Sequence, residues 1–357
     1  MIKGTIIDSS NISERFLQLS VDTKHLLKND PNELNDDVIK NIEISILELW
    51  RNLKIFDWFG SKSIVYLVGL STRYSYNVLP KNIIKKEDVE IFALWLTIVW
   101  VIDGIFDKRK KYLTPKDKIY IKSITSYPNL DPDNKYLADI HTVYEYYLTK
   151  LPPSRSLCFH ELQYWFDRYL ETLETQNISS LGTLETPRML FISLDQYSKF
   201  RLDSGAMMCV VWHSFMFLEN IDITEIKKEV NFFRSVSLAV SYHNDILSLA
   251  RDYKQNTPNL VTVISQGKIP NEEIIMKSIS IVNNIYKDLS TMFKTMTNIY
   301  RDIIGHIGIS ITEGSYRWAN GEQRYEMGAL LVKNLLSGKS ISGLVISDEE
   351  TVGDPRS

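Results

Sequence analysis

The pattern that decides the fold lies in nine residues, Asn244-Asp245-Ile246-Leu247-Ser248-Leu249-Ala250-Arg251-Asp252. They place an amide, a hydroxyl and a carboxylate at four-residue intervals inside a helical pattern that covers residues 222–255. At 100° per residue, the side chains of Asn244, Ser248 and Asp252 drift only about 80° around the helix axis, so their oxygen atoms can converge. Three oxygen donors suit Mg²⁺, which keeps water or phosphate oxygens in its remaining positions. Arg251 falls on the same face, where its charge would meet a phosphate.

The bulk composition is that of an ordinary globular protein. The chain has 357 residues, 44% of them hydrophobic, which is enough for a sizeable core. A formal net charge of −3 gives no electrostatic footprint for nucleic acid or for anionic membranes. With only Cys158 and Cys209, the sequence excludes a disulfide framework and a cysteine zinc site. The start lacks the apolar run of a signal peptide, so we expect a cytoplasmic protein.

Helical periodicity without strand alternation predicts an all-α fold. The helical pattern begins at Asp36 and resumes over residues 86–107, 133–150, 155–178, 186–219, 222–255 and 271–303. Between them, residues 110–135 contain three prolines and are predicted to form a short helix with loops. We expect three parts in the chain: residues 1–35 as an N-terminal segment, 36–336 as a single helical domain, and 337–357 as a flexible tail.

The segment from Lys86 to Asp107 is apolar almost all round between Ile91 and Ile102, which is typical of a helix buried inside a helical body. That apolar run is too short to span a bilayer. It is followed by Asp103-Gly104-Ile105-Phe106-Asp107, with two carboxylates one turn apart. Acids at a helix C-terminus are disfavoured by the macrodipole, so we expect a compensating cation near Asp103 and Asp107.

Two further segments of the chain carry candidate functional residues. In Phe200-Arg201-Leu202-Asp203-Ser204-Gly205-Ala206, the residues Asp203, Ser204 and Gly205 weaken an otherwise continuous helix. Either a functional break or a simple loop between two helices explains the pattern. Further on, Trp318 precedes the pair Arg324-Tyr325 by six residues. Asn244, Ser248 and Asp252 form a stripe along one helix face. His243 lies about 100° around the helix from this stripe and is predicted to be structural.

Taken in order, these motifs resemble a microbial-type class I terpene synthase over roughly residues 36–330. The resemblance pairs four elements of that family with Asp103 and Asp107 (the aspartate-rich motif), Arg201, Ser204 and Gly205 (the diphosphate sensor, linker and effector), Asn244, Ser248 and Asp252 (the second metal motif), and Arg324-Tyr325 (the terminal pair).

This resemblance implies an isoprenoid synthase helical bundle around a central aromatic cavity, with Mg²⁺ at its mouth, three ions in all once substrate is bound. The implied metal ligands are Asp103, Asp107, Asn244, Ser248 and Asp252. The implied contacts to the diphosphate of the substrate are Arg201, Ser204, Gly205, Arg251, Arg324 and Tyr325. The implied cavity wall includes Val99, Trp100 and Trp318, whose rings would stabilise a carbocation by about 2 kcal/mol through cation–π contact.

The expected reaction is Mg²⁺-dependent ionisation and cyclisation of farnesyl diphosphate to a sesquiterpene, by a monomer or homodimer. The alternative within the family is a diterpene synthase that uses geranylgeranyl diphosphate. A prenyltransferase would carry a second aspartate-rich motif in place of the Asn244 motif, and a non-catalytic helical binding protein would leave the ordered motifs as coincidence. Two positions depart from the family pattern: Gly104, where many relatives have Asp, and Asp252, where Glu is commoner.

Overall fold

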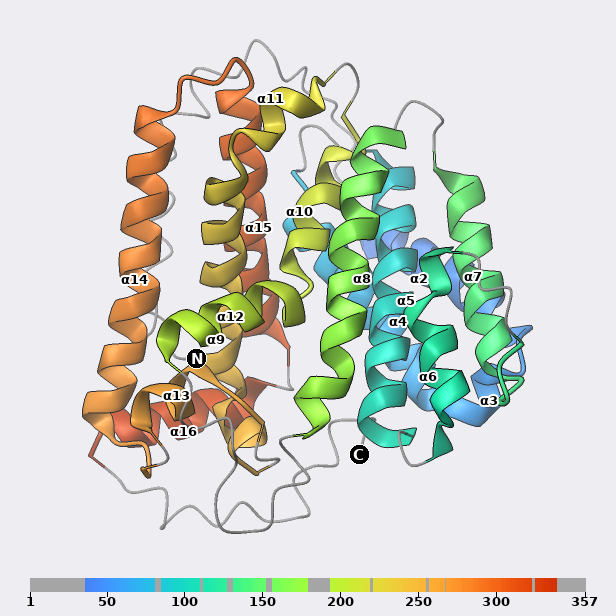
Figure 1. Cartoon of the computed structure of the whole chain (residues 1–357), viewed down its shortest axis with the longest axis horizontal. Coiled ribbons are helices and arrows are strands. Elements are labelled where there is room, and N and C mark those ends of the chain that lie inside the picture. The colour runs from blue at the N-terminus through green and yellow to red at the C-terminus, as the bar shows by residue number, and fades with distance from the viewer. Residues whose placement is uncertain are drawn as a thin grey trace.

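The computed structural model describes residues 36–80, 85–109, 112–126, 131–151, 156–178, 193–218, 221–254, 257–266, 268–322 and 325–338. Within these ranges the protein is all-α, without a single strand, which confirms the predicted fold class (Figure 1). The expected N-terminal segment 1–35, nearly all of the expected tail, and Arg324 lie outside the described residues.

The helices, labelled as in Figure 1, are α2 (Asp36–Arg51), α3 (Ile55–Phe59), α4 (Ser61–Val78), α5 (Lys86–Arg109), α6 (Pro115–Lys122), the 3₁₀ turn η2 (Ile124–Ser126), α7 (Leu137–Lys150), α8 (Ser156–Ile178), α9 (Leu194–Ser204), α10 (Met207–Phe215), α11 (Ile223–Lys227), α12 (Val230–Lys254), α13 (Leu260–Ser265), α14 (Glu272–Thr295), α15 (Arg301–Gly321) and α16 (Glu326–Leu336).

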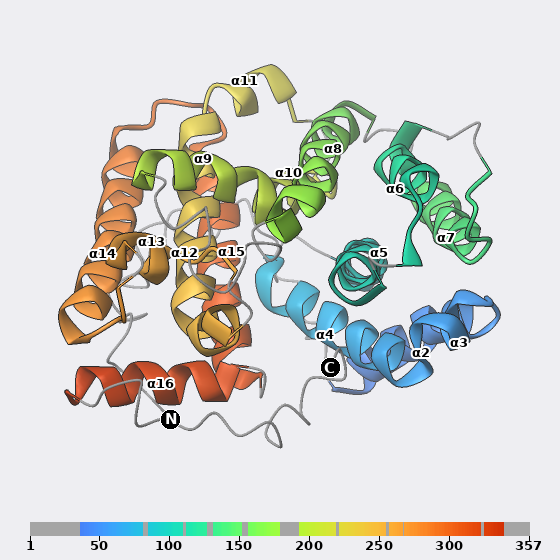
Figure 2. The same cartoon turned by 60° about the horizontal axis from the view of Figure 1, so that its bottom comes forward.

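Helix α12, which carries the opening stretch, is the centre of the C-terminal half. It packs against α9, α10, α13, α14, α15 and α16. Figure 2 shows α12, α14 and α15 together on one side and α2 to α7 on the other, with α8 and α10 between them. The two sides also meet directly, since α4 packs against both α5 and α15. This arrangement brings elements far apart in sequence to the C-terminal half of α12.

Helix α5 is buried nearly all round, as its sequence predicts. From Phe92 to Val99 every residue is buried, and Thr97 satisfies its hydroxyl by donating to the carbonyl of Ala93 at 2.8 Å. The helix is long and apolar enough to cross a bilayer, but 83% of its most apolar window is buried inside the protein. A core helix accounts for that pattern.

Several predicted helix boundaries are confirmed and several are wrong. Helix α8 matches the predicted 155–178, and α7 begins four residues later than predicted. The predicted helix 271–303 is wrong beyond Thr295, because the chain turns at Asn298 before α15 begins at Arg301. The side chain of Asn298 stabilises this turn by accepting a hydrogen bond from Tyr300 N at 2.9 Å and donating one to the Glu225 carbonyl at 2.7 Å.

Two other predicted helices are each divided in the structure. The range 222–255 consists of α11 and α12, and Asp222 caps α11 by accepting a hydrogen bond from Thr224 N at 2.8 Å. The range 186–219 holds α9 and α10, with residues 186–192 outside the described part. Helices α3, α4, α13 and α16, and α15 beyond residue 303, were not predicted.

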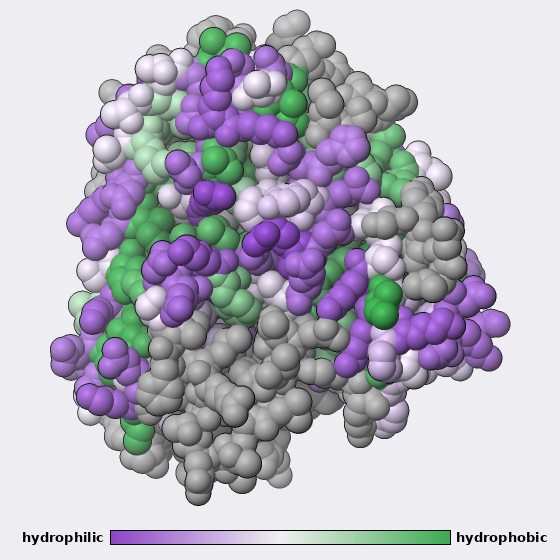
Figure 3. Space-filling model, viewed as in Figure 1, coloured by the Kyte–Doolittle hydropathy of each residue, from purple (hydrophilic) through white to green (hydrophobic). Residues whose placement is uncertain are grey.

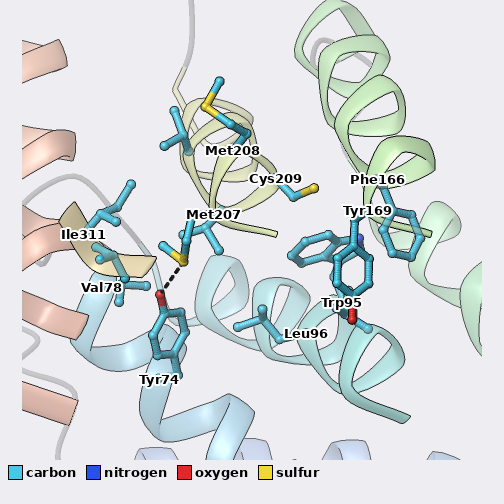
Figure 4. Close-up of a cluster of buried hydrophobic side chains, with 14 of the residues drawn as sticks. Tyr74, Val78, Trp95, Leu96, Phe166, Tyr169, Met207, Met208, Cys209 and Ile311 are labelled. Carbon is cyan, nitrogen blue, oxygen red and sulfur yellow. Dashed lines mark hydrogen bonds between the residues drawn. The ribbon is translucent and has the colours of Figure 1, made fainter. Parts of the chain in front are cut away.

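Buried aromatic and sulfur-containing side chains fill the space between α4, α5, α8 and α10. In Figure 4, Tyr74 from α4 points toward Met207 from α10, and Trp95 lies beside Phe166 and Tyr169 of α8. The face seen in Figure 3 is covered mainly by hydrophilic side chains where residues are described, with hydrophobic ones showing between them. The hydrophobic side chains of this cluster therefore lie inside the bundle, between α4, α5, α8 and α10.

Candidate active site

The stripe of Asn244, Ser248 and Asp252 lies on a single helix, α12, near its C-terminal end. Ser248 and Asp252 are each 4% exposed, and Asn244 is partly buried. The Nδ2 of Asn244 donates a hydrogen bond of 2.6 Å to the phenol oxygen of Tyr325. Its amide oxygen accepts no hydrogen bond from any described residue, so this oxygen is the one left to bind a cation.

The carboxylate of Asp252 is fully engaged by protein donors. Its Oδ1 accepts hydrogen bonds from Arg251 Nε at 2.9 Å and from Arg251 Nη2 at 2.8 Å. Its Oδ2 accepts from the Ser248 hydroxyl and from Asn259 Nδ2, the latter at 2.9 Å. An ionised carboxylate has about four lone-pair positions, and these contacts occupy them. Asp252 can therefore bind a cation only when one of its donors turns away.

The guanidinium group of Arg251 interacts electrostatically with acidic groups of α12 and α5. Burial disfavours its charged form, but the charges of Asp252, Tyr325 and Asp107 raise the pKa of Arg251 above its ordinary value. Among these charges, that of Asp107 on α5 contributes least. Both helices end at the lower edge of Figure 1, which places the two motifs at the same end of the bundle.

Asp103 is held by a tyrosine of α8. Its Oδ1 accepts a hydrogen bond of 3.0 Å from the hydroxyl of Tyr169, which is 4% exposed. Burial, followed by the charge of Asp103, raises the pKa of Tyr169 well above its ordinary value. The phenol therefore stays protonated and acts as a permanent donor to Asp103. Asp107, one turn later, is exposed.

The glycine between these acids has a packing explanation. A Cβ atom on Gly104 would lie 2.7 Å from Cζ of Phe59, whose ring is 5% exposed. The ring of Phe59 thus occupies the space that a second aspartate side chain would need. Phe59 is the last residue of α3, so a helix that the sequence did not predict fills the space beside Gly104.

The interruption after Arg201 is a junction between α9 and α10. Ala206 adopts a left-handed conformation with φ 54° directly before α10. At Gly205, a Cβ atom would lie 2.5 Å from Ser241 Oγ and 2.8 Å from the carbonyl oxygen of Arg201. The chain thus breaks between two helices at Gly205 and Ala206, and this break can approach α12 closely only because residue 205 is glycine.

Arg201 points at α12 and pairs with the residue that follows Asn244. Its Nη2 lies 2.8 Å from Oδ1 of Asp245, and the exposed fractions of the two side chains are 16% and 2%. The Nη1 of Arg201 makes a long contact of 3.5 Å with Ser204 Oγ. Burial raises the pKa of Asp245, while the charge of Arg201 opposes that shift. The predicted sensor residue is therefore brought within the same site as the α12 stripe.

Sequence reasoning missed several residues that hold this site together. Asp245 also accepts a hydrogen bond of 2.7 Å from the hydroxyl of Tyr197. Asp203 forms a bidentate ion pair with Arg168 of α8, with N–O distances of 2.7 and 2.6 Å. Asp245 lies within the quoted stretch, but its position off the stripe gave no reason to choose it. Arg168 and Tyr169 are neighbours in sequence, yet nothing in the sequence indicated that they contact two separate motifs.

An aromatic cluster lies beside the polar groups. The rings of Trp100 and Trp318 stack with centroids 6.0 Å apart, and Tyr74 meets both edge-on at 6.1 and 5.0 Å. Trp318 also contacts the ring of Tyr325 at 5.6 Å. Val99, which the resemblance placed in the cavity wall, is 1% exposed. Tyr74 was not predicted, and its hydroxyl contacts Ser315 Oγ at 3.0 Å and Met207 Sδ at 3.5 Å (Figure 4).

The donor chemistry of the site fits a hard divalent cation such as Mg²⁺. The candidates on α12 supply an amide, a hydroxyl and a carboxylate oxygen, and Asp103 supplies a second carboxylate. No three His, Cys, Asp or Glu side chains of the described residues come together. A cation in this part of the chain would thus depend on Asn244 and Ser248 as well as on the acids.

His243, which was predicted to be structural, packs beside the Asn244 stripe. It is 3% exposed and stacks on Tyr316 with the two ring centroids 5.2 Å apart. Burial lowers the pKa of His243 to about 4, so the imidazole is neutral at physiological pH.

A comparison with protein families gives one match. Residues 94–288, more than half of the chain, match the family described as terpene synthase family 2, C-terminal metal binding. The match begins within α5 and ends within α14, so it includes both acidic motifs and the α9–α10 junction. No curated protein matches the sequence.

Solved structures share the fold at low sequence identity. A linalool/nerolidol synthase from Streptomyces clavuligerus, solved with 2-fluorogeranyl diphosphate, is 12% identical with a TM-score of 0.59, over 80% of this chain and 95% of that one. An α-eudesmol synthase is 14% identical with a TM-score of 0.57, over 78% and 94%. A protein from ancestral sequence reconstruction, SVS_A2, is 11% identical with a TM-score of 0.60, over 78% and 83%. These likenesses establish the helical fold.

Proposed function

The chain belongs to terpene synthase family 2 and is a terpene synthase, and from that premise we propose that it ionises and cyclises farnesyl diphosphate to a sesquiterpene. The observation that carries the proposal is the hydrogen bond between Asn244 and Tyr325. It joins the candidate cation ligands of α12 to the start of α16, and the Tyr325 ring touches Trp318 of the aromatic cluster. A diphosphate bound at the polar side would thus have its prenyl chain beside stacked rings.

In this proposal Asp103 of α5 and the ligands of α12 would hold the cation, and the arginines would bind the diphosphate and favour its departure. Mg²⁺, when bound, would supply Lewis-acid stabilisation of the leaving diphosphate. Arg251 would turn from Asp252 toward the diphosphate, and Arg201 and Arg324 would add positive charge there. Preorganised charge of this kind stabilises the negative charge that develops on the leaving group.

The aromatic cluster would then stabilise the allylic carbocation. Trp100 and Trp318 present stacked rings, and a desolvated cation above such a ring gains about 2 kcal/mol. The surrounding side chains of Tyr74 and Val99 are buried, which supports a dry environment that keeps water from the cation. One structural neighbour was solved with 2-fluorogeranyl diphosphate, which supports a prenyl diphosphate as the class of substrate.

The test is incubation of the purified protein with Mg²⁺ and geranyl, farnesyl or geranylgeranyl diphosphate separately, followed by analysis of volatile products. We expect cyclic fifteen-carbon products from farnesyl diphosphate. A twenty-carbon product alone would favour the diterpene synthase, and longer diphosphates formed only with added isopentenyl diphosphate would favour a prenyltransferase. No product from any substrate would contradict the proposal and favour a helical binding protein.

Two variants test the site assignment. Asp103→Ala and Asn244→Ala should abolish turnover while the helical circular dichroism signal remains. The matched controls are Asp288→Ala and Asn284→Ala, because both residues are exposed on α14. Product yields equal to those of the controls would overturn the assignment of either residue.

A further inference from the structure

Asn259, at the N-terminus of α13, has both a capping contact and contacts to the candidate site. It is 0% exposed. Its Oδ1 accepts a hydrogen bond of 2.9 Å from Val261 N, which caps α13. Its Nδ2 donates to the Asp245 carbonyl oxygen at 2.6 Å and to Asp252 Oδ2 at 2.9 Å. The amide therefore uses its oxygen for α13 and its nitrogen for α12.

The other donors to Asp252 have a second role in the proposed function. Arg251 would bind the diphosphate and must then release Asp252, and Ser248 would bind the cation through its oxygen while its hydrogen can still point to Asp252. Asn259 contacts no candidate ligand other than Asp252, and its cap to α13 fixes its orientation. It is thus the donor to Asp252 that has no second role when the site is loaded.

The neighbouring residue adds a second contact from α13 to the same turn of α12. Leu260 N donates a hydrogen bond of 3.2 Å to Asp245 Oδ2, and the other oxygen of Asp245 pairs with Arg201. The start of α13 thus holds the side chains of both acids of the Asn244–Asp252 stretch. Since a side chain beside a metal ligand sets the orientation of that ligand, this start is well placed to set the site geometry.

We propose that Asn259 is a positioning residue for Asp252, holding its Oδ2 so that this short side chain can bind the cation at the position where Glu is commoner in the family. The inference rests on the proposed function, because it assumes that Asp252 binds the metal with the diphosphate. The competing explanation is that Asn259 only caps α13.

The chain offers a matched control for the capping role. Asn271 caps α14 in the same way, with its Oδ1 accepting a hydrogen bond of 3.0 Å from Ile274 N, but it is exposed. Serine is also a good N-cap residue, so Asn259→Ser and Asn271→Ser both keep a cap. Only Asn259→Ser removes an amide donor from Asp252.

The experiment measures binding of inorganic diphosphate in the presence of Mg²⁺ by isothermal titration calorimetry, with thermal unfolding in parallel. We expect Asn259→Ser to weaken binding by about 10- to 100-fold, the usual effect of removing a partner of a metal ligand, while Asn271→Ser binds like wild type. Binding of Asn259→Ser equal to that of wild type would overturn the inference. Failure of the wild-type protein to bind would instead count against the proposed function.

A double-mutant cycle separates positioning from general damage. In an Asp252→Ala background, Asn259→Ser should have no further effect on diphosphate affinity, because the residue it acts through is gone. A loss in that background as large as in wild type would show a purely structural role and contradict the inference. If Asn259→Ser fails to fold, Asn259→Thr takes its place, since threonine also caps and also lacks the amide donor.

Discussion

The side-chain amide of Asn244 on α12 donates a hydrogen bond of 2.6 Å to the phenol oxygen of Tyr325, although 81 residues separate them in the chain. Helix α16 can come this close because residue 328 is glycine: a Cβ there would lie 1.6 Å from the carbonyl oxygen of Leu247. The contact orients the amide of Asn244 and brings the terminal tyrosine to the candidate metal ligands.

Tyr325→Phe should weaken binding of Mg²⁺ and inorganic diphosphate by about fivefold, or about 1 kcal/mol, since a neutral hydrogen bond contributes about that much. The reason is that the amide of Asn244 loses the partner that orients its oxygen. Calorimetric titration of both proteins measures the difference. Tyr300→Phe is the control, because its hydroxyl accepts a hydrogen bond of 3.1 Å from Asp222 N in another part of the fold. Equal losses in the two variants would contradict the prediction.

Tyr169→Phe should raise the Mg²⁺ concentration needed for half-maximal turnover by about tenfold, because Asp103 loses its only described hydrogen-bond donor. The turnover at saturating Mg²⁺ should fall less. Steady-state kinetics at a series of Mg²⁺ concentrations provides the measurement. If the Mg²⁺ dependence is unchanged, Tyr169 does not orient Asp103.

Gly205→Ala should destabilise the protein by about 2 kcal/mol, because the added Cβ meets both Ser241 Oγ and the Arg201 backbone. Ser241→Ala in the same chain should restore part of the loss, since it removes the side-chain overlap but not the backbone one. Gly321→Ala is the control, because a Cβ there meets nothing within 4 Å. Urea unfolding measures the free energies, and a neutral Gly205→Ala would show that the junction is not tightly packed.

Trp318→Phe should shift products from cyclic hydrocarbons toward early-quenched alcohols, because it weakens the stack on Trp100 next to the reacting chain. Product ratios at equal conversion of farnesyl diphosphate provide the measurement. Trp212→Phe is the control: Trp212 is 1% exposed and packs against Phe215 and Phe233. A product change in the control as large as in Trp318→Phe would remove the special role of Trp318.

His306 should make the fold less stable in mild acid. Burial lowers the pKa of His306, with Asp302 opposing the shift, and its Nδ1 is buried without a partner among the described residues. In the unfolded chain its pKa is about 6.5, so as the pH falls below that value the unfolded state takes up a proton first and stability declines. This contribution is complete above pH 6.5 and is lost as the pH falls toward the pKa of the folded protein.

His306→Gln should therefore lose less stability than wild type between pH 7.5 and pH 5.5, as measured by urea unfolding at the two values. His160→Gln is the control, since His160 is exposed on α8. If wild type and His306→Gln show the same decline, another group is responsible for the acid sensitivity.

Sequence patterns were sufficient for the features that depend on local periodicity. The four-residue spacing of Asn244, Ser248 and Asp252 places them on one face of any α-helix, and the apolar run before Asp103 required burial of α5. The errors came at helix ends. The apolar periodicity continues through residues 296–300, but α14 ends at Thr295, and Asn298 in the turn bonds to the distant carbonyl of Glu225.

Tertiary structure decided which side chains from other helices form hydrogen bonds with the candidate ligands and their neighbours. Tyr169 reaches Asp103 over 66 residues and Arg201 reaches the Asp245 region over about 40. Asn259 is closer in the chain, but it reaches Asp252 only because the chain reverses between α12 and α13. Such contacts depend on how helices pack, which no local pattern encodes.

The sequence by itself thus determined the helical class, the α12 stripe and the order of the motifs, because each follows from residue types at fixed helical spacing. The packing of α3, α8, α9, α13 and α16 around the ends of α5 and α12 decided the rest. It filled the position beside Asp103 with Phe59, saturated Asp252 with protein donors and set Tyr325 against Asn244. The physical reason is that hydrogen bonds and close packing act over a few ångströms, so they are fixed only when distant helices meet.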